Sequence, residues 1–223
     1  MTKYFALSFH KCGTRSLSEA LNSVGIKSLH HPRRYNGVNY LNMVAPVAGQ
    51  PLEVLRCLAP LIASFDGHAD VPWPGLYREL AETIPDSRFI LVTRDLEDWW
   101  TSLAKHWGLH YMRRMLSPFE RIQYRPYFKE DIARTFGLED KELFIAAHRS
   151  HIEQVKRFLP AERLLVFDLA DADKHDRLRR FLGTGMTPQF PRVGGRNVLS
   201  KLRRLGSIPL QRVTYQLLTN WPK

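Results

Sequence analysis

The chain has 223 residues, of which 44% are hydrophobic and 25% are charged. This composition excludes an intrinsically disordered chain and predicts a single domain around one hydrophobic core. The formal net charge is +11 and the pI is 9.9, which favours acidic partners. The basic residues are spread along most of the chain, and neither a zinc-finger pattern nor an aromatic RNP-type motif occurs, so we do not expect nucleic-acid binding.

No uncharged apolar run is long enough to cross a membrane, and the first residues lead directly into a predicted strand. We therefore expect neither a signal peptide nor a transmembrane segment, and we expect a cytoplasmic protein. The two cysteines, Cys12 and Cys57, have no spacing typical of a zinc site or a disulfide framework. Free thiols are expected, and no metal site is predicted.

The chain begins with a predicted strand, a tight loop and a helix. Residues 4–9 form an apolar run typical of a buried strand, and His10–Gly13 form the loop. Thr14 or Ser16 is expected to cap the following helix, and Ser16 and Glu19 have the spacing of a capping box. Apolar residues with helical spacing indicate the helix itself, namely Leu17, Ala20, Leu21 and Val24.

The loop and the helix start carry groups that suit an anion. Lys11 and Arg15 supply two cations, Gly13 allows a ligand to approach the backbone, and hydroxyls follow at Thr14 and Ser16. With the positive end of the helix dipole, they predict an anion-binding loop. The simpler alternative is an ordinary connection with a solvated lysine. The loop is not a Walker A motif, because Lys11 precedes the only glycine, and the GxGxxG fingerprint is also absent.

Strands and helices alternate along the rest of the chain. A loop over the sheet edge is predicted at 33–50, and broken helical pieces are predicted at 116–136. The fold class that this pattern predicts is α/β, with three layers (α/β/α) and a central parallel sheet of about five strands. Further strands are predicted at 26–29, 61–65, 88–93 and 163–167, and helices at 51–59, 75–84, 96–107, 141–159 and 175–182.

A single domain, residues 1–223, is predicted because no linker, repeat or low-complexity tract divides the chain. Its C-terminal part, residues 187–223, is expected to form a basic loop and a helix that pack on this domain. Four tryptophans are predicted to be core residues rather than ligand stacks, namely Trp73, Trp99, Trp100 and Trp107.

The anion loop resembles a known cofactor loop. The segment Lys11-Cys12-Gly13-Thr14-Arg15-Ser16 is similar to the 5′-phosphosulfate-binding loop of sulfotransferases that use 3′-phosphoadenosine 5′-phosphosulfate (PAPS). That loop reads Lys-Ser-Gly-Thr-Thr in cytosolic members and Lys-Gly-Gly-Thr-Arg in some heparan-sulfate members. The resemblance implies a P-loop-like fold, PAPS as donor co-substrate and cofactor contacts from all six residues. Cytosolic members stack an aromatic on adenine from this loop, but Ser16 occupies that position here, so adenine needs another partner.

A second motif lies on another predicted strand. Arg94-Asp95-Leu96-Glu97-Asp98, followed by Ser102, resembles the 3′-phosphate motif Arg-Asp-Pro-x-Asp-x3-Ser of the same family. Because ligands in open parallel sheets bind at the carboxyl ends of strands, Arg94 and Ser102 are expected on the edge that holds Lys11. Leucine replaces the proline of the motif, which we expect to affect the turn more than the phosphate contact. In the structural alternative, Arg94 pairs with Asp98 and Ser102 is incidental. The resemblance spans most of residues 3–190.

The resemblance implies an in-line displacement in which an acceptor hydroxyl, or an amine, attacks sulfur and adenosine 3′,5′-bisphosphate leaves. Lys11 is assigned to neutralise the charge that develops on the leaving oxygen. No metal is required for this reaction. The acceptor is expected to be a small molecule, a glycan or a lipid, and the sequence does not specify it or the oligomeric state.

The acceptor proton requires a base. Asp70 is the first choice, because Asp70-Val-Pro matches the place where cytosolic members carry their catalytic histidine in His-x-Pro, provided that partial burial raises its pKa. His68 is the second choice, since histidine titrates near neutral pH. A turn or cap role is the alternative for Asp70. His30 and His31 are predicted to line the wall of the site.

Two other function classes remain open at this point. A P-loop-type nucleotide kinase is opposed by the missing Gly-Lys-Ser/Thr and by the lack of an obvious aspartate for Mg²⁺. A non-catalytic basic anion-binding module is consistent with the charge. In the tail, Arg192–Arg196 falls where the family often contributes a loop over the 3′-phosphate.

Overall fold

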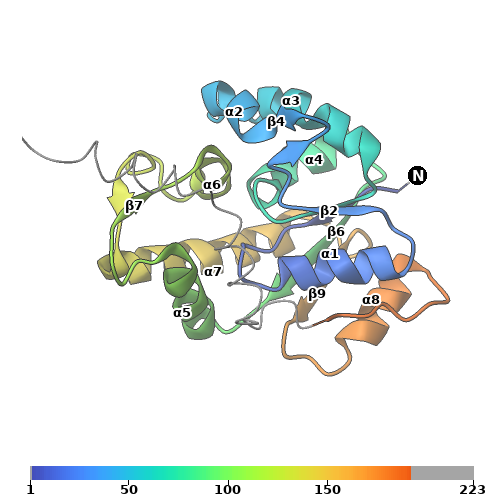
Figure 1. The fold of residues 1–223 in the computed structure, drawn as a ribbon. Coiled ribbons are helices and arrows are strands. Elements are labelled where there is room, and N and C mark those ends of the chain that lie inside the picture. Colours follow the sequence, from blue (N-terminus) through green and yellow to red (C-terminus); the bar gives the residue numbers. More distant parts are fainter. Residues whose placement is uncertain (1, 192–223) are drawn as a thin grey trace, which may run out of the picture. The chain divides into compact units, whose positions relative to one another are not determined.

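The computed structural model of the chain describes residues 2–191 (Figure 1). The predicted basic tail, residues 187–223, therefore lies mostly outside the described residues. The single domain with a packed C-terminal helix, and any role of Arg192–Arg196, stay predictions.

The centre of the fold is a five-stranded sheet in which every neighbouring pair is parallel. This confirms the predicted parallel sheet of about five strands. In spatial order, the strands are β2 (Ser28–His30), β5 (Gly67–Ala69), β1 (Tyr4–Ala6), β6 (Arg88–Thr93) and β9 (Leu164–Asp168).

Helices cover both faces of the sheet, as Figure 1 shows. On one face, apolar side chains of α1 (Thr14–Ser23) and α8 (Lys174–Leu182) pack against Ala6 and Ile90. On the other face, Phe5 and Phe89 pack in a cluster with residues of five helices. Since neighbouring residues of a strand point to opposite faces, the apolar runs of β1 and β6 serve both layers. The five helices are α2 (Tyr40–Val44), α3 (Pro51–Ser64), α4 (Tyr77–Thr83), α6 (Pro118–Tyr124) and α7 (Lys141–Phe158).

A second, strongly aromatic cluster extends the fold beside the sheet. It includes Trp99, Trp100, Trp107 and Phe144, and Trp73 is fully buried in the main core, so all four tryptophans are core residues as predicted. The capping box of Ser117 and Glu120 starts a helix within the region predicted as broken helical pieces. The elements here are α5 (Leu96–Trp107), β7 (Arg114–Met115), α6 (Pro118–Tyr124), β8 (Thr135–Phe136) and η3 (Leu138–Asp140).

The strand predicted at 61–65 is wrong. Leu61 belongs to α3, where Leu58 and Leu61 are both buried at helical spacing. The strand that occupies this place in the sheet is β5, whose sequence Gly-His-Ala has no apolar pattern.

The predicted loop at 33–50 contains short elements instead. A two-stranded hairpin opens it, and a short helix and a 3₁₀ turn follow. A further 3₁₀ turn precedes α4 in the part predicted as one helix. These elements are β3 (Arg34–Tyr35), β4 (Val38–Asn39), α2 (Tyr40–Val44), η1 (Ala45–Val47) and η2 (Trp73–Leu76).

The strand order creates a switch point between β1 and β6. From β1 the chain runs to β2 at one edge of the sheet, and from β6 it runs to β9 at the other edge. The two connections therefore diverge beyond the carboxyl ends of these adjacent strands. Ligands in open parallel sheets bind at such points.

Candidate active site

The loop after β1 has an unusual backbone. Lys11 and Gly13 both have positive φ values, 74° and 79°. Such a conformation is uncommon for a lysine and marks a site that its surroundings hold in place. Two side chains do so: Arg94 Nη1 donates to the Lys11 carbonyl oxygen at 3.2 Å, and Trp99 Nε1 donates to the His10 carbonyl oxygen at 3.0 Å. The β6–α5 segment thus fixes the shape of the loop.

Helix α1 begins immediately after this loop. Gly13 is the N-cap residue, and no side chain caps the helix, so the predicted caps at Thr14 and Ser16 are wrong. Thr14 Oγ1 instead lies 3.2 Å from His30 Nε2. A Cβ at Gly13 would come within 2.8 Å of the Leu169 side chain, so both φ and space call for glycine here. The first backbone N–H groups of α1 have no side-chain cap and suit an anion.

The loop side chains divide into buried and accessible groups. Cys12 is fully buried, with Sγ 3.7 Å from His148 Nε2, and burial raises the pKa of its thiol. Only its backbone can therefore serve a ligand. Arg15 is exposed, and Lys11 and Ser16 are partly exposed. Both cysteines are free thiols, as predicted.

The second predicted motif lies across the switch point. Arg94 reaches the lysine loop, whereas the Asp98 backbone N–H donates to the Asp95 side chain at 2.9 Å as the cap of α5. No Arg94–Asp98 ion pair forms among the described residues. Ser102 is half-buried one turn before His106 on α5. Burial, with repulsion from Lys11 and the ring of His10, lowers the pKa of His106 to about 4.

His106 is therefore close enough to Lys11 to feel its charge, although its sequence position was not among the predicted site residues. Its position four residues after Ser102 puts both on one face of α5, and this spacing was the available signal.

A different group gathers at the ends of β2 and β5. These strands are neighbours, and His30 lies opposite Ala69 in the register. His31 and Asp70 directly follow these two strands, so the Asp70 carboxyl lies next to both histidines. Asp70 Oδ2 is 3.3 Å from His30 Nε2 and 3.5 Å from His31 Nδ1. Asp70 and His31 also have positive φ values, 77° and 54°. The predicted wall residues His30 and His31 are thus partners of the predicted base.

The Asp70 carboxyl is a weak base in this setting. Burial by itself would raise its pKa, but the hydrogen bond from His31 and the fields of His30 and His10 outweigh burial and bring the pKa to about 2. The expectation that burial lifts this pKa is therefore wrong. Asp70 Oδ1 is also buried and has no hydrogen-bond partner among the described residues, so it can accept one more donor.

His68 is a core residue, contrary to its selection as the second base. Its ring is fully buried, stacks on Phe5 with centroids 4.7 Å apart, and lies 4.9 Å from Trp73. Burial, with the field of Lys3, lowers its pKa to about 3. His68 lies within β5 and its ring points into the core, whereas Asp70 follows the end of the strand with a positive φ, which removes it from the alternation of the strand. A hydroxyl outside the core cannot reach this ring.

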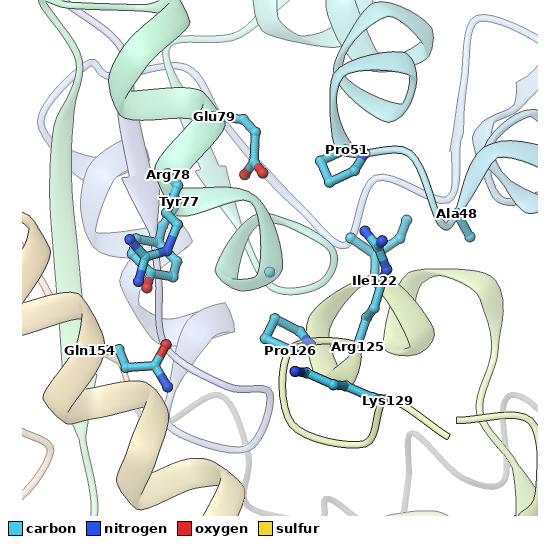
Figure 2. Close-up of a pocket in the computed structure, with 11 residues that line it drawn as sticks. Ala48, Pro51, Tyr77, Arg78, Glu79, Ile122, Arg125, Pro126, Lys129 and Gln154 are labelled. Carbon is cyan, nitrogen blue, oxygen red and sulfur yellow. The ribbon is translucent and has the colours of Figure 1, made fainter. Parts of the chain in front are cut away.

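A pocket of about 480 Å³ lies elsewhere, among α4, α6 and α7. Figure 2 shows Arg125, Pro126 and Lys129 on one side of it, with Tyr77 and Arg78 across from them. None of the predicted site residues lines this pocket. We therefore locate the chemistry at the sheet edge, where the positive φ values and the ionisable groups converge.

Two further features concern residues 2–191, the part of the chain that the structure describes. No group of three or more histidine, cysteine, aspartate or glutamate side chains in this part of the chain is arranged to hold a metal ion. No helix within it has the length and apolar character needed to cross a bilayer.

Comparison with known proteins identifies the family and supports the fold. The family described as "Sulfotransferase domain" matches residues 3–198. Among solved structures, the chain is similar to a sulfotransferase from Alicyclobacillus acidocaldarius, with 14% identity and a TM-score of 0.53. That match covers 92% of this chain and 91% of the bacterial one, and at this identity it shows the fold. None of the curated proteins matches the chain.

Proposed function

The chain belongs to the sulfotransferase family, and we propose that it transfers the sulfuryl group of PAPS to an acceptor hydroxyl, or an amine, by in-line displacement. One observation carries the proposal: Arg94 Nη1 lies 3.2 Å from the Lys11 carbonyl oxygen, across the switch point between β1 and β6. The two segments that resemble the 5′-phosphosulfate loop and the 3′-phosphate motif thus meet at one edge of the sheet. A nucleotide with phosphate groups at both positions fits two such cationic groups.

The loop after β1 binds the 5′-phosphosulfate in this proposal. The backbone of Cys12 and Gly13, with the first N–H groups of α1 at Thr14, Arg15 and Ser16, surrounds the anion. The ammonium group of Lys11 neutralises the charge that grows on the oxygen between phosphorus and sulfur as the S–O bond breaks. Donors already oriented toward a developing charge are among the strongest catalytic devices.

Arg94 and Ser102 bind the 3′-phosphate. The guanidinium supplies charge, and the hydroxyl of Ser102 adds one donor from the next helix. Support comes from the position of Arg94 at the end of β6 and from the partial exposure of both residues. His106, which titrates at about 4, is neutral at pH 7 and adds no charge next to Lys11.

Asp70 belongs to the group that accepts the acceptor proton. It lies at the end of β5, which is adjacent to β1 in the sheet. Its ionised carboxylate and the two neighbouring histidines form an acid–base cluster beside the donors of the anion loop. Proton removal from the hydroxyl as the O–S bond forms is the remaining chemical requirement. The reaction we propose needs no metal ion.

We propose that the acceptor is a small molecule, a glycan or a lipid with a hydroxyl group. We also propose a cytoplasmic location and no nucleic-acid partner, as predicted from the sequence. The sequence does not specify the oligomeric state.

The test is transfer from ³⁵S-labelled PAPS to a panel of sugars, lipids, phenols and amines. We expect at least one labelled product with the wild type, none above background with Lys11→Ala, and wild-type activity with Lys156→Ala. Lys156 is an exposed lysine of α7 and serves as the matched control. If the chain phosphorylates an acceptor from Mg²⁺-ATP instead, it is a kinase. Tight binding of PAPS without any product would identify a non-catalytic module.

A further inference from the structure

We infer that His31 takes the acceptor proton and that Asp70 orients its ring, an assignment that rests on the proposed sulfuryl transfer. From the sequence, Asp70 itself was predicted as the base and His31 as a wall residue of the site. The arrangement at the ends of β2 and β5 leads to a different division of roles.

The orientation of the His31 ring carries the argument. Its Nδ1 faces Asp70 Oδ2 at 3.5 Å, and its side chain is 42% exposed. Nε2 is on the far side of the ring and makes no hydrogen bond to the described part of the chain. A carboxylate that accepts the Nδ1 proton leaves Nε2 with its lone pair, which is the geometry of a histidine base oriented by an aspartate. The separation is long, as is common before a substrate is bound.

The backbone holds the two residues face to face. His31 and Asp70 both adopt positive φ, 54° and 77°, directly after paired strands. The His31 N–H donates to the Ala69 carbonyl oxygen at 3.0 Å, and the ring packs edge-on against Phe119. Side-chain-bearing residues rarely adopt this conformation, and two in contact indicate a site whose geometry has a use.

The other candidate bases are less suitable. The Nε2 atom of His30 already faces both Thr14 Oγ1 and Asp70 Oδ2, at 3.2 and 3.3 Å. His10 is buried, and its Nδ1 lies 3.2 Å from Gln123 Nε2. Asp70, with a pKa of about 2, would accept a proton far less readily than an imidazole does.

Proton transfer accompanies the exchange of two bonds at sulfur. The acceptor oxygen forms a bond to sulfur, and the bond from sulfur to the 5′-phosphate oxygen breaks, with its electron pair leaving on adenosine 3′,5′-bisphosphate. The hydroxyl proton moves to Nε2 of His31. The resulting imidazolium is stabilised by the Asp70 carboxylate and then loses its proton to water.

The first test is His31→Gly with chemical rescue. Glycine accepts a φ of 54° without strain, so the variant should fold. Asn36→Gly is the matched control, because Asn36 also has a positive φ, 46°, on an exposed hairpin. We expect His31→Gly to lower kcat about 100-fold or more, with unchanged affinity for adenosine 3′,5′-bisphosphate. Added imidazole should restore a substantial part of the turnover, and Asn36→Gly should behave as wild type.

The second test is the tautomer of His31, read from ¹⁵N chemical shifts of the ring at alkaline pH. We expect the Nδ1–H form in the wild type and loss of that preference in Asp70→Asn, a readout that does not depend on turnover. Turnover of His31→Gly within about threefold of the control, a loss that imidazole does not rescue, or an Nε2–H ring each overturns the inference. A failure of the proposed function is distinct, because then the wild type itself yields no sulfated product.

Discussion

The two halves of the sheet edge differ in what they present to a ligand. At the ends of β1 and β6, hydrogen-bond donors and cations dominate: Lys11, the start of α1, and Arg94. At the ends of β2 and β5, a carboxylate and two imidazoles meet, and their contacts are between side chains. The groups of the first half suit the binding of an anion, and those of the second half suit proton transfer.

This difference follows from how each half is held. The donor half is a backbone structure, fixed by Arg94 and Trp99 on carbonyl oxygens of the loop. The acid–base half depends on two neighbouring strands in register and on the left-handed residues that follow them. Substitutions in the first half should therefore affect donor binding and the leaving group, and those in the second should affect the acceptor proton.

The largest effect is expected for Lys11→Ala. Loss of the counter-ion for the leaving oxygen should lower kcat by a factor that corresponds to about 3 kcal/mol or more, by comparison with the removal of one oxyanion donor. Steady-state transfer from labelled PAPS measures it. Activity within about threefold of wild type would show that the loop lysine does not act on the leaving group.

Asp70→Asn should also reduce turnover strongly, but without the effect on the nucleotide. The amide keeps the shape and loses the charge that orients His31, so we expect kcat to fall about 100-fold, with the Kd for adenosine 3′,5′-bisphosphate nearly unchanged. Calorimetry and transfer assays on the same preparation separate the two. A matching loss of nucleotide affinity would contradict the division between the halves.

Arg94→Ala and Ser102→Ala should weaken the 3′-phosphorylated nucleotide selectively. Each removes a contact to phosphate that is worth about 1.5 to 3 kcal/mol when charge assists it, with the smaller effect expected for the hydroxyl. 5′-AMP should bind both variants about as it binds wild type. Equal weakening of the two ligands would indicate a disturbed loop, because Arg94 also holds the Lys11 carbonyl.

The sequence predicted the donor half better than the acid–base half. Lys11 and Arg94 follow apolar runs of the sequence, residues 4–9 and 88–93, and the local sequence alone indicated their places. Asp70 and His31 meet through strand pairing between residues far apart in the chain, which local periodicity does not show. The strand before Asp70 was missed because Gly67–Ala69 has no apolar pattern. The predicted side-chain cap of α1 was wrong because Gly13, in the left-handed conformation, is the N-cap residue.

The smallest effect is expected for His68→Leu, in the core beneath Asp70. Both ring nitrogens of His68 are buried without partners among the described residues, so the variant should gain about 1 kcal/mol of stability at neutral pH. The pKa of His68 is lowered from 6.5 to about 3. The unfolded chain thus binds this proton first, and stability falls as pH falls from 6.5 toward 3.

Denaturant unfolding from pH 7 to pH 4 should show a weaker acid destabilisation for His68→Leu than for wild type, with turnover retained. Loss of turnover in this variant at unchanged stability would instead indicate that His68 takes part in proton transfer.

Calorimetry of the wild type without metal tests most directly the claim that the switch point between β1 and β6 binds a 3′-phosphorylated nucleotide. We predict that adenosine 3′,5′-bisphosphate binds at least about tenfold more tightly than 5′-AMP, a difference of about 1.4 kcal/mol from the added charged contact, and that Mg²⁺ does not change this. Equal affinity for the two nucleotides, or binding only of Mg²⁺-ATP, would contradict the account.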